Sequence, residues 1–227
     1  MELRHELKFR LPVAEAQALR QRLKTVMAYD PFNEKTQGIY EIYSLYFDTP
    51  HEKALREKQS GIADREKFRL RYYGDRDSVI HLEKKFKQEG LTGKIQGSMT
   101  KAECLSLLKG PGHDGFLLES PYPVLRELYV KMRTQMLMPK TVVAYTRQAF
   151  VFPPGNIRVT FDYNVRTHAR SVDFLNRGLY WQDPNEAGFT LLEVKYDRFL
   201  PSLIRDIIQC GVRETSYSKF EACHLYD

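Results

Sequence analysis

Charged and apolar residues alternate along residues 67–73, whose sequence is Lys-Phe-Arg-Leu-Arg-Tyr-Tyr. Successive side chains of an extended strand point to opposite faces, so Lys67, Arg69 and Arg71 are expected to share one face. Three cations along one face repel one another unless solvent or anions separate them. For one strand taken alone, a solvated sheet surface is the simplest interpretation.

The same alternation recurs in several other segments that favour β-strands. Their charged faces would carry Glu6, Lys8 and Arg10 in residues 3–11, His81, Glu83, Lys85 and Lys87 in 79–87, Arg147 in 141–152, Arg158, Thr160 and Asp162 in 156–163, and Glu193 and Lys195 in 189–197. Apolar or aromatic residues form the opposite face of each segment. The recurrence weakens the interpretation as one solvated surface.

The composition indicates a globular protein with a preference for anionic partners. The chain has 227 residues, of which 42% are apolar and 28% charged, and its formal net charge is +6. No apolar run approaches the roughly 20 residues of a membrane span, and the first residues do not form a signal peptide. Cys104, Cys210 and Cys223 lack the spacing of a disulfide framework or a zinc site, as do the histidines for a metal site. We therefore expect a cytoplasmic protein.

Further patterns predict the elements between and beyond these strands. Helices are expected from Pro12 to about Tyr29, at 49–58 as a short helix or turn, from a Thr100–Glu103 capping box to Gly110, at 124–138, at 201–210 and after 217; strands are also expected at 38–48, 65–73 and 178–182. Residues 30–37 are expected to form a polar loop. Residues 90–97 are rich in glycine and are expected to form a loop that holds Lys94.

Two architectures remain open at this point. If the helices pack on the apolar faces of a strongly curved sheet, the charged faces point inward and line a lumen. Buried cations at that density require an anion, because desolvated like charges are costly unless they are paired. Alternatively, an open antiparallel sheet would present one wet, basic face to nucleic acid or an acidic partner. A Walker-type phosphate loop and a dinucleotide fingerprint are both missing from the sequence.

The order of several short motifs resembles the VTC-type polyphosphate polymerase domain of the triphosphate tunnel metalloenzyme superfamily. The motifs are Glu6-Leu7-Lys8, Ser44-Leu45-Tyr46-Phe47-Asp48, Arg69-Leu70-Arg71-Tyr72-Tyr73-Gly74, Leu82-Glu83-Lys84-Lys85, Tyr145-Thr146-Arg147, Ile157-Arg158-Val159, Leu192-Glu193-Val194-Lys195 and Ser216-Tyr217-Ser218-Lys219-Phe220. Each motif is weak alone, but their shared order is specific. The resemblance implies a single α+β domain over residues 1–227, built as a closed antiparallel β-barrel tunnel with a charged lumen and surrounded by helices.

The resemblance also implies roles for individual residues. Catalytic positions lining the tunnel are matched by Lys8, Arg69, Arg71, Lys85, Arg147, Arg158 and Lys195, and further phosphate-binding positions by Lys94, Ser218 and Lys219. Glu193 matches the carboxylate that holds Mn²⁺ or Mg²⁺. The implied reaction transfers the γ-phosphoryl group of ATP to a growing polyphosphate chain and releases ADP. The implied partners are ATP and polyphosphate and not nucleic acid, and any coupling to a membrane would need recruitment to a membrane partner.

One departure from the superfamily bears on the reaction. Hydrolytic and cyclase branches open with Glu-x-Glu-x-Lys, whereas Arg4 stands here in place of the first Glu. This favours the polymerase, with a triphosphate or polyphosphate hydrolase and a non-catalytic polyphosphate-binding sensor as alternatives. Glu6 and Glu83 are expected mainly to pair with cations. Surface or rim charges are expected at Arg10, Lys84 and Lys87, and core positions at Tyr40, Tyr43, Tyr46, Tyr72 and Tyr73.

Overall fold

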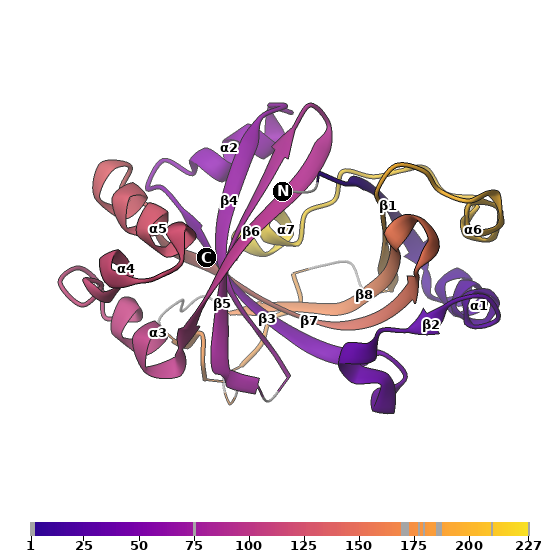
Figure 1. Cartoon of the computed structure of the whole chain (residues 1–227), viewed down its shortest axis with the longest axis horizontal. Helices are drawn as coiled ribbons and strands as arrows, with labels where there is room; N and C mark the ends of the chain where they lie inside the picture. Colours follow the sequence, from indigo (N-terminus) through magenta and orange to yellow (C-terminus); the bar gives the residue numbers. More distant parts are fainter. Residues whose placement is uncertain are drawn as a thin grey trace.

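A curled antiparallel sheet forms the centre of the computed structural model, which describes residues 3–74, 76–168, 173–176, 178, 180–184, 188–209 and 211–226. Within these residues the sheet has nine strands in the order β1-β9-β8-β7-β3-β4-β5-β6, and β2 pairs with β7 outside this path. The strands are β1 (His5–Pro12), β2 (Ala28–Tyr29), β3 (Ile39–Asp48), β4 (Arg65–Tyr73), β5 (Arg76–Gln88), β6 (Leu91–Thr100), β7 (Met138–Phe152), β8 (Ile157–His168) and β9 (Phe189–Tyr196). Figure 1 shows the sheet curling around a central space.

The predicted closure of the barrel is wrong, because the two edge strands do not pair along their length. They meet at one isolated bridge, in which Arg4 and Thr92 exchange backbone hydrogen bonds of 2.9 and 3.0 Å. Further along β1, the free edge bonds instead to the C-terminal segment, where the Thr215 amide donates to the Lys8 carbonyl at 2.8 Å. In Figure 1, β1 and β6 run in different directions. The sheet is therefore a half-barrel, and residues 214–220 form the missing wall of its cavity.

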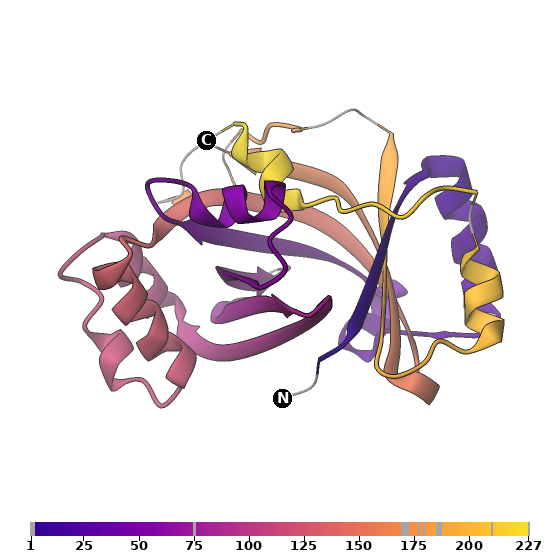
Figure 2. The ribbon, with the colours of Figure 1, turned by 90° about the horizontal axis from the view of Figure 1, so that it is seen from above.

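Helices cover the two halves of the sheet. The helices are α1 (Val13–Lys24), α2 (Lys53–Gln59), α3 (Lys101–Leu108), α4 (Phe116–Glu119), α5 (Pro123–Thr134), α6 (Ser202–Ile208) and α7 (Lys219–His224), with 3₁₀ turns η1 (Pro31–Thr36) and η2 (Pro154–Asn156). Figure 2 shows α3, α4 and α5 on one side and α1 and α6 on the other. Each group buries an apolar cluster against the sheet, as expected for helices on the outside of a curved sheet.

α7, the short helix near the C-terminus, belongs to neither of these two groups. α7 packs against β7 and β8, and its Phe220 ring lies 5.1 Å from the Tyr46 ring of β3. Phe220 and Tyr46 belong to a third apolar cluster, to which α2 also contributes. Lys219, at the first position of α7, lines the cavity. α7 therefore contributes both to an apolar cluster and to the lining of the cavity.

Most predicted elements are present, including the Thr100–Glu103 capping box that begins α3. The first helix is shorter than predicted, because it ends at Lys24 and residues 28 and 29 pair with β7. The predicted strand at 178–182 is reduced to an isolated bridge between Gln182 and Thr167 among the described residues, which exclude residue 179. Cys210, the predicted end of the helix at 201–210, also lies outside the described residues. No helix in the described ranges is long and apolar enough to cross a membrane.

The predicted glycine-rich loop at 90–97 is in fact strand β6 beyond its first residue. At Gly93 and Gly97 a side chain would have no room, so these two glycines do not mark a turn. A Cβ at Gly97 would lie 2.6 Å from both Leu125 Cδ1 and Tyr122 Cβ, so only hydrogen fits beneath α5. Glycine signals flexibility in a sequence, but here it permits close approach of a helix to a strand.

We expect Gly97→Ala to destabilise the protein by about 1–3 kcal/mol, because the added methyl group overpacks a well-filled contact. Denaturant unfolding measures the change. Gly115→Ala is the matched control, since a methyl group added at Gly115 would have no heavy atom within 4 Å and the residue has a negative φ of −58°. Equal stabilities of the two variants would contradict the packing argument.

Candidate functional site

A cavity of about 500 Å³ lies inside the curl of the sheet. Strands β1, β3, β4, β5, β6, β7 and β9 contribute side chains to its sheet walls, and residues 214–220 supply the remaining wall. The described residues that line it include eleven Lys or Arg side chains but three Glu side chains. Such an excess of cations in a partly enclosed space focuses a positive potential that attracts anions.

Glu6 is the carboxylate at the centre of one lysine cluster. Its oxygens accept hydrogen bonds from Lys85 at 2.9 and 3.1 Å, and Lys8 and Lys195 lie at 2.9 and 3.8 Å. These side chains meet because β1 pairs with β9 and places Glu6 opposite Lys195. Burial opposes ionisation of Glu6, but Lys85, Lys195 and Lys8 outweigh it and hold the pKa well below its usual value. The carboxylate is therefore ionised and keeps three ammonium groups together.

A second cluster joins β7, β8, β9 and α7. Arg147 binds the Asp162 carboxylate through two hydrogen bonds of 2.6 and 2.7 Å, and Lys219 lies 2.6 Å from the same carboxylate. Glu193 is reached by Lys219 at 3.2 Å, Arg147 at 3.5 Å and Lys195 at 3.7 Å. Burial opposes the charge on Glu193, but these cations and Lys8 depress its pKa well below the ordinary value. These pairings favour the charged forms of Arg147, Asp162, Glu193 and Lys219 inside the fold.

A third cluster surrounds Glu83 on β5, which is buried behind the cavity wall. Arg69 donates to Glu83 at 2.6 and 2.7 Å and to the Tyr46 hydroxyl at 2.9 Å. Arg71 lies 3.6 Å from Glu83 and donates to the hydroxyl of Tyr145 at 3.1 Å. The arginines are thus held by rigid partners, with their guanidinium groups facing the cavity. Preorganised arginines of this kind suit bidentate recognition of phosphate.

The structure brings most of the predicted site residues together. The cavity is lined by Lys8, Arg69, Arg71, Lys85, Arg147, Lys195, Ser218, Lys219 and Glu193. Two predicted residues are not part of that lining. Lys94 on β6 is 46% exposed and lies 3.1 Å from Glu83. Arg158 pairs with Asp30 and donates to the hydroxyl of Tyr40 at 2.8 Å.

Several residues of the site were not assigned a role from the sequence. Asp162 anchors Arg147 and Lys219, and its place on the charged face of the alternating segment 156–163 was the available signal. Tyr46 is buried in the core as expected and also lines the cavity, as does Tyr145. Lys87, which was expected at the surface or rim, also lines the cavity. Lys58, Arg65 and Lys67 line it as well, and only Lys67 was placed on a charged face by periodicity.

The pairing of charges modifies the expected need for an anion. Each inner cation has a carboxylate partner among Glu6, Glu83, Asp162 and Glu193, although seven Lys and Arg side chains share these four carboxylates. Expected pairing of Glu6 and Glu83 with cations is confirmed. The excess of cations over carboxylates in the lining still favours an anionic ligand.

The carboxylates also limit what a metal could bind. In the described part of the chain, no cluster of three or more His, Cys, Asp or Glu side chains could hold a metal ion. Glu6 and Glu193 nevertheless lie in one cavity, linked through Lys195 at 3.8 and 3.7 Å. Mg²⁺ commonly takes one or two carboxylates and completes its shell with water and substrate phosphates. The donor set therefore fits a divalent cation that arrives with a phosphate ligand.

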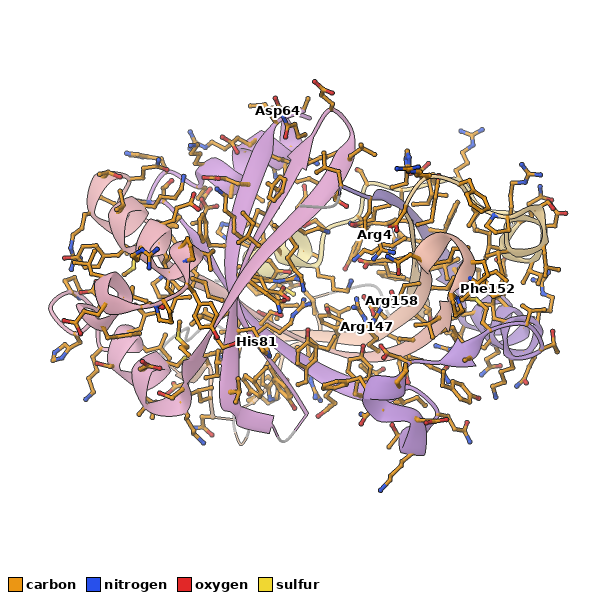
Figure 3. The ribbon with its side chains drawn as sticks, in the orientation of Figure 1. Arg4, Asp64, His81, Arg147, Phe152 and Arg158 are labelled. Atoms are coloured by element: carbon orange, nitrogen blue, oxygen red, sulfur yellow. The ribbon has the colours of Figure 1, made fainter. Side chains whose placement is uncertain are left out.

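Arg4 departs from the Glu-x-Glu-x-Lys pattern. Its guanidinium pairs with Asp197 at 2.8 Å, and it does not line the cavity. Figure 3 shows Arg4, Arg147 and Arg158 around the space enclosed by the half-barrel.

Solved structures with similar folds cover most of the chain but at low similarity. The PH1819 protein from Pyrococcus horikoshii OT3 is 12% identical, with a TM-score of 0.47, and the match covers 96% of this chain and 97% of that protein. The PH1012 protein from the same organism is 12% identical, with a TM-score of 0.42 and coverage of 90% and 85%. These values are too low to bear on function. No curated protein is similar enough in sequence to match the chain.

The family comparison agrees with the site. The family described as VTC domain matches residues 3–226, which is nearly the whole chain. The match includes the cation-lined strands, the carboxylates between them and the C-terminal segment that completes the cavity. This chain therefore belongs to the VTC domain family.

Proposed function

We propose that this protein is a metal-dependent polyphosphate polymerase that uses ATP. It would transfer the γ-phosphoryl group of ATP to the terminal phosphate of a linear polyphosphate and release ADP. The observation that carries the proposal is the cavity itself, in which cations greatly outnumber carboxylates and two glutamates remain available to a divalent cation. Membership of the VTC domain family supports the same substrate class.

The chemistry asks for positioning and charge neutralisation more than for covalent participation. Phosphoryl transfer proceeds in line, with charge spread over the oxygens of the transferred group. Arg69, Arg71 and Arg147 would hold phosphate oxygens with paired N–H groups. Ammonium groups of Lys8, Lys85, Lys195 and Lys219 would turn from carboxylates toward the phosphates. Ligand binding would thus exchange one set of ion pairs for another.

Bond changes in the proposed step balance without a further reactant. An oxygen of the terminal phosphate attacks the γ-phosphorus, and the bond from that phosphorus to the β–γ bridging oxygen breaks. The bridging oxygen leaves with ADP, and the acceptor chain is longer by one phosphate. Lys and Arg side chains around the cavity would stabilise the charge during the transfer.

Glu193, with Glu6 beside the same lysine, would hold Mn²⁺ or Mg²⁺ when a nucleotide is bound. The ion would supply additional positive charge to the phosphate oxygens in transfer. Ionised carboxylates are required for this role, and the depressed pKa values of Glu6 and Glu193 keep both charged at neutral pH. The position of Arg4 outside the cavity lining favours this two-carboxylate arrangement over a hydrolytic one.

The direct test is to incubate the purified protein with ATP and Mn²⁺ and to separate the products on a gel that resolves phosphate chains. We expect polyphosphate and ADP, and no products when a chelator removes the metal. Free phosphate as the only phosphate product would indicate a hydrolase. Tight polyphosphate binding without turnover, in the presence of either metal, would indicate a binding protein and contradict the proposal.

A further inference from the structure

The cations at one end of the cavity have fewer carboxylate partners than the inner cations have. Lys58, Arg65, Lys67 and Lys87 form this group, which we call the lysine mouth. In the part of the chain that the structure describes, Lys67 and Lys87 have no carboxylate within ion-pair distance. Arg65 donates to the Ile62 carbonyl, and Lys58 meets Glu221 at 3.5 Å. The lysine mouth therefore has unsatisfied positive charge.

The lysine mouth continues the line of arginines that begins deep in the cavity. Arg65, Lys67, Arg69 and Arg71 alternate on one face of β4, so neighbouring members are about 7 Å apart along the strand. Arg65 is the first residue of β4. Figure 3 shows the preceding residue, Asp64, at the rim of the molecule and far from Arg147 and Arg158. The line thus runs from the interior to the edge of the cavity.

Lys67 is the most unusual member of the lysine mouth. Its ammonium group lies 4.6 Å from the centre of the Phe220 ring of α7. The charged groups that affect its pKa most are cations: Arg65 on the same strand, Lys58 at the end of α2, Lys8 on β1 and Lys85 on β5. Burial, followed by repulsion from these four groups, lowers the pKa of Lys67 to about 7. An anion placed here would attract the ammonium group and so oppose the lowering of its pKa by both burial and repulsion.

We propose that the lysine mouth is a separate phosphate-binding position, centred on Lys67, for a linear polyphosphate that extends beyond the inner cations. This rests on the proposed function for the identity of the chain, but not on its turnover. The inner arginines and lysines are enough for a triphosphate. A longer chain that follows the face of β4 reaches Lys67 next, and its negative charge replaces the missing carboxylate.

Proton uptake follows from this position. A phosphate group beside Lys67 favours the ammonium form, so binding of a long chain takes up a proton where free Lys67 is neutral. Affinity for a long chain should then be highest below pH 7 and fall as the pH rises above the pKa of about 7. Lys85, whose pKa is lowered to about 8, contacts Glu6 in the interior and should affect long and short chains alike.

Calorimetric titration of the full chain with tripolyphosphate and with long-chain polyphosphate tests the proposal. Near pH 6, we expect Lys67→Gln to weaken long-chain binding about ten-fold and tripolyphosphate binding less than about two-fold. Lys67→Arg should keep the long-chain affinity, because its charge persists at all these pH values. Between about pH 6 and pH 8.5, wild-type affinity for the long chain should fall more than that of Lys67→Arg.

Lys53→Gln is the matched control, since it removes one positive charge from α2 at a side chain that is 52% exposed and outside the cavity lining. It should leave both affinities unchanged. Equal losses for the two probes in Lys67→Gln, or no loss for either, would overturn the proposal. A protein that makes no polyphosphate but shows the predicted binding pattern would refute the polymerase and leave the lysine mouth intact. A polymerase without the pattern would do the reverse.

Discussion

Glu193→Gln should abolish most metal-dependent turnover while leaving phosphate binding intact or stronger. Glu193 is surrounded by Lys219, Arg147 and Lys195, so removing its charge makes the cavity more positive. Tripolyphosphate should therefore bind the variant at least as tightly as the wild type. Loss of the metal-holding carboxylate should reduce turnover by about 10²–10³-fold, the usual effect of removing one preorganised electrostatic contact.

Opposite effects on binding and turnover are what separate a metal role from a structural one. A variant that merely unfolds loses both, whereas tripolyphosphate should raise the melting temperature of a folded Glu193→Gln protein. Glu57→Gln serves as the control, because Glu57 pairs with Lys53 at 3.8 Å outside the cavity lining. Turnover retained by Glu193→Gln at saturating Mn²⁺ would move the metal site to another carboxylate.

Asp162→Asn should lower the free energy of unfolding by about 3–5 kcal/mol, the usual cost of breaking a buried ion pair from one side. Asp162 is buried and holds Arg147 and Lys219, both buried as well. The substitution would leave two desolvated cations with Glu193 as their remaining carboxylate. Urea unfolding with and without tripolyphosphate measures the effect. The anion should stabilise the variant more than the wild type, because it replaces the lost charge.

The pH dependence of stability gives a second readout of Asp162. Burial disfavours its charge, but Arg147 and Lys219 outweigh this and lower the folded-state pKa. The stabilisation is therefore complete above the unfolded-state pKa and is lost as the pH falls through the folded-state value. Asp162→Asn should show a shallower loss of stability in acid than the wild type. Asp197→Asn, at a partly exposed pair with Arg4, should change stability by about 1 kcal/mol or less. Equal effects of the two substitutions would contradict a special role for Asp162.

Local patterns in the sequence determined most elements because their causes are local. Alternation of charged and apolar residues placed β4, β5, β8 and β9 and assigned their faces correctly. The start of α3 was recognisable because the side chains of Thr100 and Glu103, three residues apart, each accept a hydrogen bond from the backbone amide of the other residue. The order of the motifs along the chain was enough to identify the family, since that order can be read without knowing which segments are in contact.

Contacts between distant segments were not encoded in any local pattern. Gly97 was expected in a loop. Its lack of a side chain instead makes room for α5, and the neighbouring residues in the sequence do not reveal that contact. The closed barrel was implied by the family resemblance, but in the structure the free edge of β1 pairs with residues 214 and 215, and β6 does not pair along it. An edge strand accepts whichever partner the rest of the chain brings to it.

Sequence by itself determined which side chains of this protein carry charge toward one face of the sheet, and that cations predominate there. Tertiary structure alone decided which of those cations are paired with a carboxylate. Lys85 meets Glu6 across 79 positions of the chain, and Lys219 meets Glu193 across 26. Lys67 stands on the same face, but among the described residues it forms no ion pair with a carboxylate and lies against the Phe220 ring. The physical reason is that Coulomb energy depends on distance in space, which the curl of the sheet and the position of α7 set.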